Sequence, residues 1–316
     1  MRYLVTGGAG FIGSNTVDEL VRRGHGVVVL DDLSAGKEEN LSEVRSKITF
    51  VKGSITDLEA VQKAMHQAEY VIHLAARASV PRSVKDPLET NRVNVEGTLN
   101  VLVAARDNRV KRLVFAASSS AYGETPTLPK MEAMEPKPIS PYGVSKYVGE
   151  LYASVFGRCY GLETACLRYF NIFGPRQDPD SPYSGVLSRF ATAFLADEPP
   201  VIYGDGEQTR DFTYVENAVH ANLLACEAPG AAGQIFNIGT GSRFSLNQTL
   251  ELLRKIAGKK LEAQHEPARE GDIRDSQADI SKAKELLGYE PAVTFEEGLQ
   301  RTYAWYQQQH QKTPAS

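Results

Sequence analysis

The sequence is poor in cysteine and has no long apolar run. Its 316 residues include three cysteines, Cys159, Cys166 and Cys226, which form neither a CxxC pair nor an even set. A disulfide framework is therefore not expected, and a reducing, cytoplasmic location is. The six histidines show no HExxH or other metal-ligand spacing, so we expect no metal site. No apolar run reaches the roughly 20 residues of a membrane helix, and glycines interrupt the apolar start of the chain, which argues against a signal peptide.

Strong charge of either sign is also missing. The net charge is −4 and no long basic run occurs, so neither a nucleic acid nor a membrane surface is an expected partner. Hydrophobic residues make up 42% of the chain, which is enough for one large domain or two tightly joined ones.

Short apolar runs typical of strands alternate with helical periods through the first half. The strand-like runs are RYLV, GVVVL, ITFV, YVIHL, RLVFAA and ETACLRY, and helical segments such as 13–23 and 89–107 lie between them. This alternation predicts an α/β protein with a Rossmann-like, doubly wound parallel sheet. After Tyr169, glycine, proline and aspartate become frequent, which indicates a smaller, loop-rich C-terminal α/β part. We expect domains at 1–170 and 171–310, with some later segments returning to the first sheet, and a flexible tail at 311–316 within the disordered-looking QQQHQKTPAS.

A glycine turn joins the first strand to the first helix. Gly7, Gly10 and Gly13 have the spacing GxxGxxG, and glycine allows both a tight turn and a close approach of the backbone to a pyrophosphate. The following helix would offer free N–H groups and the positive end of its dipole. The second strand ends in Asp31 and Asp32, and a carboxylate there can accept both hydroxyls of an adenosine ribose while repelling a 2′-phosphate. The sequence therefore predicts NAD rather than NADP, with Asp31 as the first choice of acid.

A tyrosine and a lysine four residues apart form the candidate catalytic group. Tyr142 and Lys146 are expected on a helix capped by Ser140 and begun by Pro141. The tyrosine is a poor base at neutral pH, and we expect the neighbouring ammonium to lower its pKa. Ser118, Ser119 and Ser120 follow a strand and should reach the rim where the glycine loop lies. This combination predicts oxidation of a secondary alcohol with a nicotinamide cofactor.

The remaining apolar residues of this helix suggest two buried faces. Val144, Val148, Leu151 and Val155 form one stripe, which we expect to face the core, with Tyr142 and Lys146 on the opposite side. Tyr147, Tyr152 and Phe156 lie away from the stripe, as in a helix bundle across a homodimer.

Together these motifs resemble the extended short-chain dehydrogenases/reductases. HLAARASVPRS, NRVNVEGTLN, LRYFNIFGPRQ, YGDGEQTRDF and REGDIRDSQAD resemble, within that superfamily, the UDP-sugar 4-epimerases. The SSS-x-YG form at Ser118 is most similar to that of bacterial UDP-N-acetylglucosamine 4-epimerases. The likeness covers nearly the whole chain.

The resemblance implies a set of binding residues. It implies catalysis by Ser118, Tyr142 and Lys146, and NAD binding also by Phe11, Ile12, Ser54, Ile55, Leu74, Ala75, Ala76 and Asn94. The UDP part would be held by Asn171, Arg210, Arg269 and Asp272. The substrate site would further include Ala78, Ser79, Ser119, Gln177, Gly185, Tyr203 and Ser276.

In the family that this chain resembles, the residue at one position limits which sugars the enzyme accepts. In this family a residue in the GD…AD segment limits the substituent at sugar C2, and it is often tyrosine where only UDP-glucose and UDP-galactose react. Ser276 stands there, and Gly185 and Ala78 are also small. We therefore expect activity on UDP-GlcNAc and UDP-GalNAc, and on the plain UDP-hexoses as well.

Two other functions stay open. A 4,6-dehydratase of the superfamily would need an acid and a base beside the catalytic hydroxyl, where this chain has Ser119 and Ser120. A non-catalytic NAD-binding regulator would typically lack the Tyr142 and Lys146 pair, which this chain keeps.

Overall fold

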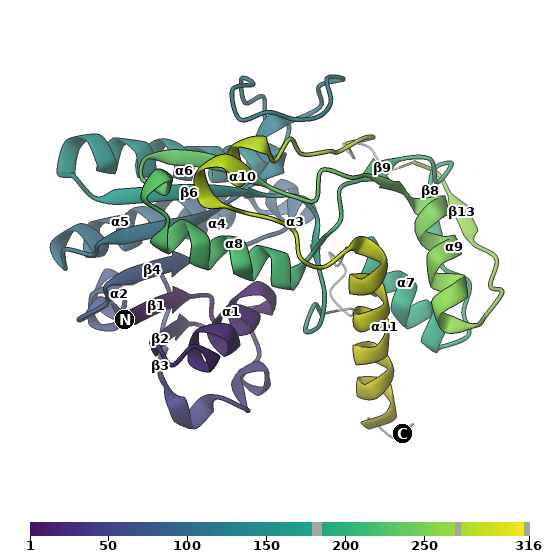
Figure 1. Cartoon of the computed structure of the whole chain (residues 1–316), viewed down its shortest axis with the longest axis horizontal. Coiled ribbons are helices and arrows are strands. Elements are labelled where there is room, and N and C mark those ends of the chain that lie inside the picture. The colour runs from purple at the N-terminus through teal and green to yellow at the C-terminus, as the bar shows by residue number, and fades with distance from the viewer. Residues whose placement is uncertain (179–184, 269–272, 313–316) are drawn as a thin grey trace.

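A parallel sheet of seven strands forms the centre of the molecule in the computed structural model, which describes residues 1–178, 185–268 and 273–312 (Figure 1). From one edge to the other the strands are β11 (Gln234–Ile238), β6 (Glu163–Tyr169), β5 (Arg112–Ser118), β4 (Tyr70–His73), β1 (Arg2–Thr6), β2 (Gly26–Asp31) and β3 (Ile48–Lys52). All neighbouring pairs are parallel, as the buried apolar runs predicted. The expected Rossmann-like fold is confirmed.

Helices cover both faces of this sheet. On one face, α1 (Phe11–Arg22) packs against β1 and β2, and α8 (Val215–Glu227) packs beside it against β5 and β6. On the other face lie α2 (Leu58–Met65), α5 (Gly97–Asp107) and α6 (Pro141–Tyr160). Strand order reverses between β1 and β4, because β2 and β3 lie on one side of β1 and the later strands on the other. Ligands of such sheets bind in the crevice at the carboxyl ends of the strands beside this reversal.

The segment expected as one helix over 89–107 is divided. It consists of α4 (Pro87–Asn91), a π-helical turn (Arg92–Glu96) and α5. The π turn carries Asn94, whose side chain is buried. Such turns are rare and often mark functional sites because they redirect a side chain.

The later part of the chain is divided between the sheet and a smaller unit. β11 and α8 return to the sheet, as expected of some later segments. Beside it lie two-stranded pairs and helices of the described residues, on the right of Figure 1, and their bounds are α7 (Val186–Leu195), β8 (Val201–Tyr203), β9 (Thr209–Arg210), β12 (Phe244–Ser245), α9 (Leu246–Ala257), β13 (Gln264–Glu266) and α11 (Phe295–Lys312). The pair of β7 (Ile172–Phe173) and β10 (Thr213–Tyr214) packs against α8, and α10 (Ser281–Leu287) packs on β11 and α8. The domain boundary at residue 170 stays a prediction.

Two expectations about helices were wrong. The stretch 307–312, expected to be disordered, is helical in α11, which packs against α7 and α9; residues 313–316 lie outside the described part. In α6, the stripe expected to face the core faces outward, and Val144, Leu151 and Val155 are 47%, 48% and 49% exposed. The opposite side, with Lys146 and Glu150, is buried on the sheet. Periodicity locates an apolar stripe but does not say what covers it.

Candidate active site

The glycine turn has the geometry of a phosphate cradle, and its three glycines serve different purposes. Gly7 has φ +70°, and a Cβ there would lie 2.7 Å from the backbone nitrogen of Ala75. A Cβ on Gly13 would lie 2.0 Å from the Gly7 oxygen, so this glycine lets the helix pack on the turn. A Cβ on Gly10 would meet only the Gly7 oxygen, at 3.2 Å, so its missing side chain leaves space open to the pocket.

The start of α1 leaves donors for an anion. The first hydrogen bond of the helix runs from Ser14 N to Gly10 O, and no side chain caps this end. The backbone N–H groups of Phe11, Ile12 and Gly13 are therefore not used inside the helix. All three residues line the pocket, which suits the pyrophosphate of a dinucleotide.

Asp31 ends β2 beside this turn and is 7% exposed. Its two carboxylate oxygens each accept one backbone N–H, from Ala9 at 2.9 Å and from Leu33 at 2.8 Å. Burial raises the pKa of this carboxyl, and these two hydrogen bonds oppose that change. Each oxygen keeps acceptor capacity for a ribose hydroxyl. Asp32 instead accepts the N–H of Ser34 in the following turn, so the geometry favours Asp31 as the ribose acceptor.

A pocket of about 970 Å³ connects the glycine turn to the tyrosine and lysine. It collects, from distant segments, most of the residues predicted to bind the cofactor. These are Gly7, Gly10, Phe11, Ile12, Gly13, Asp31, Asp32, Ser54, Ile55, Leu74, Ala75, Ala76, Tyr142 and Lys146, together with Ala78, Ser79 and Gln177 from the predicted substrate site.

Asn94 lies behind the pocket wall rather than in it. Its amide oxygen accepts the backbone N–H of Arg77 at 2.7 Å, and its amide nitrogen donates to Ser145 Oγ at 2.9 Å. Ser145 in turn donates to the Tyr142 carbonyl oxygen at 2.8 Å. Asn94 therefore links the loop after β4 to the first turn of α6. Residues of both segments line the pocket, so Asn94 stabilises the wall of the pocket from behind.

Tyr142 and Lys146 enter the pocket from the first turns of α6. Ser140 caps this helix as predicted, accepting the N–H of Gly143, and Pro141 is its first residue. The Lys146 ammonium is 4% exposed and donates to the Ala116 carbonyl oxygen at 2.8 Å. Burial lowers its pKa to about 8, and the charge of Glu150 opposes this change.

The pKa of Tyr142 differs from the expectation. Burial raises it, and a hydrogen bond with Ser118 is the interaction that opposes the rise. The Lys146 ammonium donates its hydrogen bond to the Ala116 carbonyl oxygen, and no hydrogen bond from it to the phenol is present among the described residues. Ser118, at the end of β5, also accepts the N–H of Ser120 at 3.2 Å, which leaves its hydroxyl hydrogen for the phenol oxygen. Ser118 is thus within hydrogen-bonding reach of the phenol oxygen.

The residues predicted for the sugar nucleotide lie at several places. Ser276 Oγ and the Asn171 side chain are within 3.4 Å of each other, and Gly185 lies next to the Gln177 amide. Arg210 is in β9 and Tyr203 is in β8, whereas Ser119 begins the short helical turn after β5. Arg269 and Asp272 lie outside the described residues. Their common role in binding stays a prediction.

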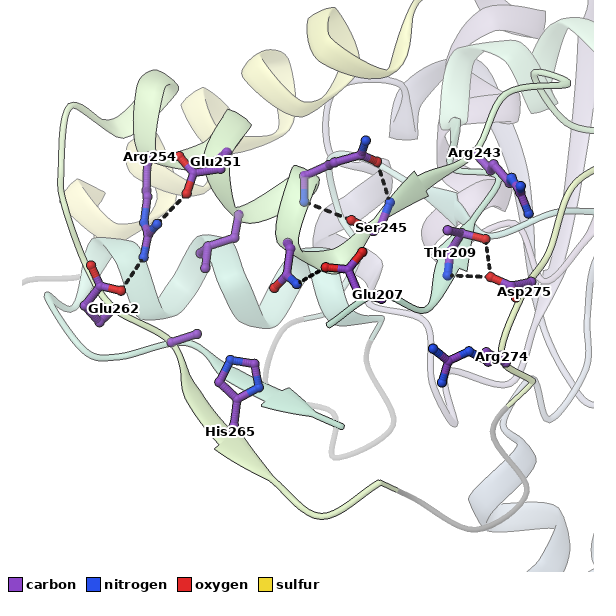
Figure 2. Close-up of a pocket in the computed structure, with 14 residues that line it drawn as sticks. Glu207, Thr209, Arg243, Ser245, Glu251, Arg254, Glu262, His265, Arg274 and Asp275 are labelled. Carbon is purple, nitrogen blue, oxygen red and sulfur yellow. Dashed lines mark hydrogen bonds and ion pairs between the residues drawn. The ribbon is translucent and has the colours of Figure 1, made fainter. Parts of the chain in front are cut away.

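Hydrogen bonds between Thr209 of β9 and Asp275, which we call the Thr209–Asp275 latch, hold the segment that carries Ser276. Asp275 accepts both the backbone N–H and the hydroxyl of Thr209, at 3.1 and 2.5 Å (Figure 2). The backbone N–H of Ser276 then donates to the Thr209 carbonyl oxygen at 3.1 Å. These bonds fix Ser276 relative to Arg210, the next residue of β9.

Thr209 and Asp275 also line a second cavity of about 900 Å³, on the side of the smaller unit drawn in Figure 2. Two of its three arginines form ion pairs, Arg254 with Glu251 and Glu262, and Arg274 with Asp205, and the third is Arg243. We assign it no ligand.

Sequence reasoning missed contributions from α11. Trp305 and Gln309 line the main pocket, and the Tyr306 hydroxyl donates to the Gln177 carbonyl oxygen. These residues lie at the other end of the chain from the glycine turn, and no local motif marks them. Their role follows only from the fold, which brings α11 to the pocket.

Comparison with known proteins agrees with this geometry. Residues 3–239 match the family described as the NAD dependent epimerase/dehydratase family, and the chain belongs to it. NAD, the cofactor predicted from the sequence, is thereby confirmed. No metal-binding group of histidine, cysteine or carboxylate side chains occurs among the described residues, and none of the described helices is long and apolar enough to cross a membrane.

Several individual relatives of this chain are UDP-sugar 4-epimerases. A UDP-glucose 4-epimerase of Mycolicibacterium smegmatis is 41% identical over 98% of this chain and 100% of that protein. The crystal structure of UDP-glucose 4-epimerase from Thermotoga maritima with UDP-glucose has a TM-score of 0.94 and 44% identity, covering 98% of this chain and 100% of that one. UDP-N-acetylglucosamine 4-epimerase from Methanobrevibacter ruminantium, in complex with UDP-N-acetylmuramic acid, has a TM-score of 0.94 and 40% identity, covering 98% of each chain. The resemblance to the UDP-sugar 4-epimerases is confirmed.

Proposed function

We propose that this protein interconverts UDP-sugars that differ in configuration at C4, with UDP-GlcNAc and UDP-GalNAc as substrates and UDP-glucose and UDP-galactose accepted as well. The observation that carries the proposal is the position of Tyr142, Lys146 and Ser118. Tyr142 and Lys146 line the same pocket as the glycine turn and Asp31, and Ser118 is hydrogen-bonded to Tyr142. Its relatives of known structure include epimerases for plain and for N-acetylated sugars.

The residues account for the proton of the sugar C4 hydroxyl. Tyr142 takes this proton, directly or through Ser118, whose hydroxyl is hydrogen-bonded to the phenol. NAD⁺, held by the glycine turn and Asp31, would supply a reversible hydride acceptor for C4 and would not be consumed. Loss of the proton and the hydride converts the carbinol into a 4-keto sugar. Tyr142 gives the proton back after the sugar has turned and presented its opposite face.

The charge of Lys146 supports this proton transfer. Burial raises the pKa of Tyr142, so the chain alone favours the neutral phenol. A positive charge nearby favours the phenolate, and both the Lys146 ammonium and an oxidised nicotinamide carry one. The pocket therefore suits an oxidised cofactor in the step that removes the proton.

The same reaction needs a firmly held UDP and a loosely held sugar. We assign Arg210, Asn171, Arg269 and Asp272 to UDP, because guanidinium groups bind diphosphates in bidentate fashion. Ser276, Ala78 and Gly185 leave room for an N-acetyl group at sugar C2.

Two alternatives to an epimerase are a 4,6-dehydratase, which is another enzyme of the family, and an NAD-binding regulator, which catalyses no reaction. Dehydration would need an acid and a base at the two positions after Ser118, and this chain has Ser119 and Ser120 there. The retained Tyr142 and Lys146 argue against a regulator.

One assay distinguishes the three functions. The purified protein is incubated separately with UDP-GalNAc, UDP-GlcNAc, UDP-galactose and UDP-glucose, and products are followed by NMR. We expect the C4 epimer at constant total sugar in each case. A 4-keto-6-deoxy product would establish the dehydratase, and no conversion of any of the four would leave the regulator.

We further propose that the protein is a homodimer built on α6. The outward stripe of Val144, Val148, Leu151 and Val155 runs along three turns of this helix, and α5 packs beside it. A long apolar stripe exposed to water marks an interface. A second copy fits it, because two stripes related by a twofold axis cover one another without any further partner.

A further inference from the structure

Glu150 and Arg168 form a buried ion pair beside the catalytic group. Glu150 is 2% and Arg168 1% exposed. Arg168 donates through Nε and Nη2 to the two carboxylate oxygens of Glu150, at 2.8 and 2.7 Å. The pair joins α6 to β6, and its bidentate geometry holds the carboxylate in one place.

The carboxylate lies one helical turn beyond Lys146. Residues four apart on a helix are neighbours on the same face, and this face of α6 is buried on the sheet. Lys146 donates to the carbonyl oxygen of Ala116, and its ammonium lies 5.0 Å from the centre of the Phe115 ring. The neighbours of the ammonium on β5 are thus two uncharged groups, and Glu150 supplies negative charge from α6.

The other titratable groups around the pair do not replace Glu150. His73, on β4, is neutral because burial and the charge of Lys146 lower its pKa to about 3. Tyr142 is on the pocket side, and burial raises its pKa. Around Glu150, burial raises the pKa of the Cys166 thiol on β6, so that this group is neutral too. Tyr122 offers Arg168 its ring face at 4.6 Å from Cζ, and burial raises its pKa to about 12.

Stability alone does not explain such a pair. Removing two charges from water costs free energy, and apolar residues of similar volume often stabilise an interior as well or better. Arg168 also keeps one buried nitrogen, Nη1, without a hydrogen-bond partner among the described residues. A buried pair with this cost calls for a role in the site.

We propose that Glu150, held by Arg168, is a positioning residue that keeps the buried Lys146 ammonium charged beside Tyr142. The inference rests on the proposed function, because it gives the pair a place in that reaction. Burial lowers the pKa of Lys146 to about 8, and Glu150 is the group that opposes this change. Without the carboxylate, the ammonium would lose its proton within the neutral range.

The test uses Glu150→Gln in the cofactor-loaded protein, since an amide keeps the shape and removes the charge. The pKa of Lys146 is measured directly by an NMR titration of ¹³Cε-labelled lysine, with the resonance assigned through Lys146→Arg. We expect this pKa to fall by about one unit, and the alkaline limb of the kcat–pH profile to move down with it. Glu150→Asp should restore most of both values.

Glu163→Gln is the matched control. It removes the half-exposed carboxylate of a different ion pair, which joins Glu163 of β6 to Arg112 of β5 at the start of these strands. It should change neither the pKa of Lys146 nor the profile.

An unchanged pKa of Lys146 in Glu150→Gln, with kcat lowered equally at every pH, would overturn the inference and leave a structural pair. If this variant fails to fold because Arg168 is left unpaired, Glu150→Gln/Arg168→Gln replaces it. A lower pKa of Lys146 in the double variant supports the inference, and an unchanged one overturns it. The NMR measurement does not depend on turnover, so a wild-type protein that epimerises no sugar would sink the proposed function separately.

Discussion

The Asn171 side chain donates a hydrogen bond to the Ser276 hydroxyl at 3.4 Å, although 105 positions separate the two residues in the chain. Asn171 follows β6 of the central sheet, and Ser276 lies in the segment that the Thr209–Asp275 latch holds on β9. The proposed UDP-binding asparagine and the proposed sugar-limiting serine therefore lie side by side. A larger side chain at Ser276 would therefore enter the space beside Asn171, which we propose to be part of the sugar site.

Ser276→Tyr should change the choice of sugar. The phenol would occupy the space proposed for the N-acetyl group, so kcat/KM for UDP-GlcNAc and UDP-GalNAc should fall at least about tenfold more than for the plain hexoses, a size typical of steric discrimination. The ratio is measured with all four sugars. Ser276→Ala, which stays small, should keep the wild-type ratio. An unchanged ratio in the tyrosine variant would show that Ser276 is not the limiting residue.

Tyr142→Phe should remove most of the activity while the cofactor stays bound. Loss of a general base costs about 10²- to 10⁴-fold in kcat, and the phenol also receives the Ser118 hydrogen bond. Tyr147→Phe, on the same helix, is the control and should keep wild-type kcat. Turnover by Tyr142→Phe within threefold of wild type would contradict the proposed mechanism.

The fold and the cofactor end of the site could be predicted from the sequence because their signals are local. A strand, a glycine turn and a helix adjoin in the chain, and Ser140 and Pro141 mark the start of α6 beside Tyr142. The π turn at Asn94 and the contribution of Trp305 could not be predicted, because both follow from packing between distant segments. The outward direction of the α6 stripe was missed for a related reason.

The pKa of Tyr142 was the least predictable quantity. Spacing places Lys146 one turn away, but it does not show that the ammonium is bonded to the Ala116 carbonyl or how much burial opposes the phenolate. Electrostatic balance inside a pocket depends on every neighbouring element.

Asp31→Asn should weaken NAD retention. The amide would present a donor to either a ribose hydroxyl or one of the backbone N–H groups of Ala9 and Leu33, which now both donate to the carboxylate. Loss of hydrogen bonds to a charged group should lower affinity by roughly 10- to 100-fold. Bound NAD is measured after denaturation of the purified protein. Asp32→Asn, beside it, should retain wild-type NAD; the reverse result would make Asp32 the ribose acceptor.

Leu151→Glu/Val155→Glu should produce a monomer. Two carboxylates in the C-terminal half of the outward stripe of α6 would be buried in the proposed interface without partners, which is costly. Sedimentation velocity measures the oligomeric state. Val201→Glu, at another exposed apolar position on β8, is the control and should behave as wild type. A wild-type protein that sediments as a monomer would refute the dimer.

His73 should make the stability of the protein depend on acid pH. Its ring is fully buried, with Nδ1 2.7 Å from the Thr6 hydroxyl and Nε2 3.0 Å from the Thr98 hydroxyl. Burial lowers its pKa from 6.5 to about 3 in the folded protein. Between these values the unfolded chain binds a proton that the folded chain does not. The free energy of unfolding therefore falls as pH decreases through this window, by about 1.4 kcal/mol per pH unit from this group.

Urea unfolding of His73→Asn measures this contribution. The variant should be less stable than wild type at pH 7.5, because it alters the contacts with Thr6 and Thr98, but its stability should fall less between pH 6.5 and pH 4.5. His66→Gln, at an exposed position, should follow the wild-type curve. Equal slopes for His73→Asn and wild type would mean that the ring takes up a proton in the folded state, which burial and the nearby Lys146 charge oppose.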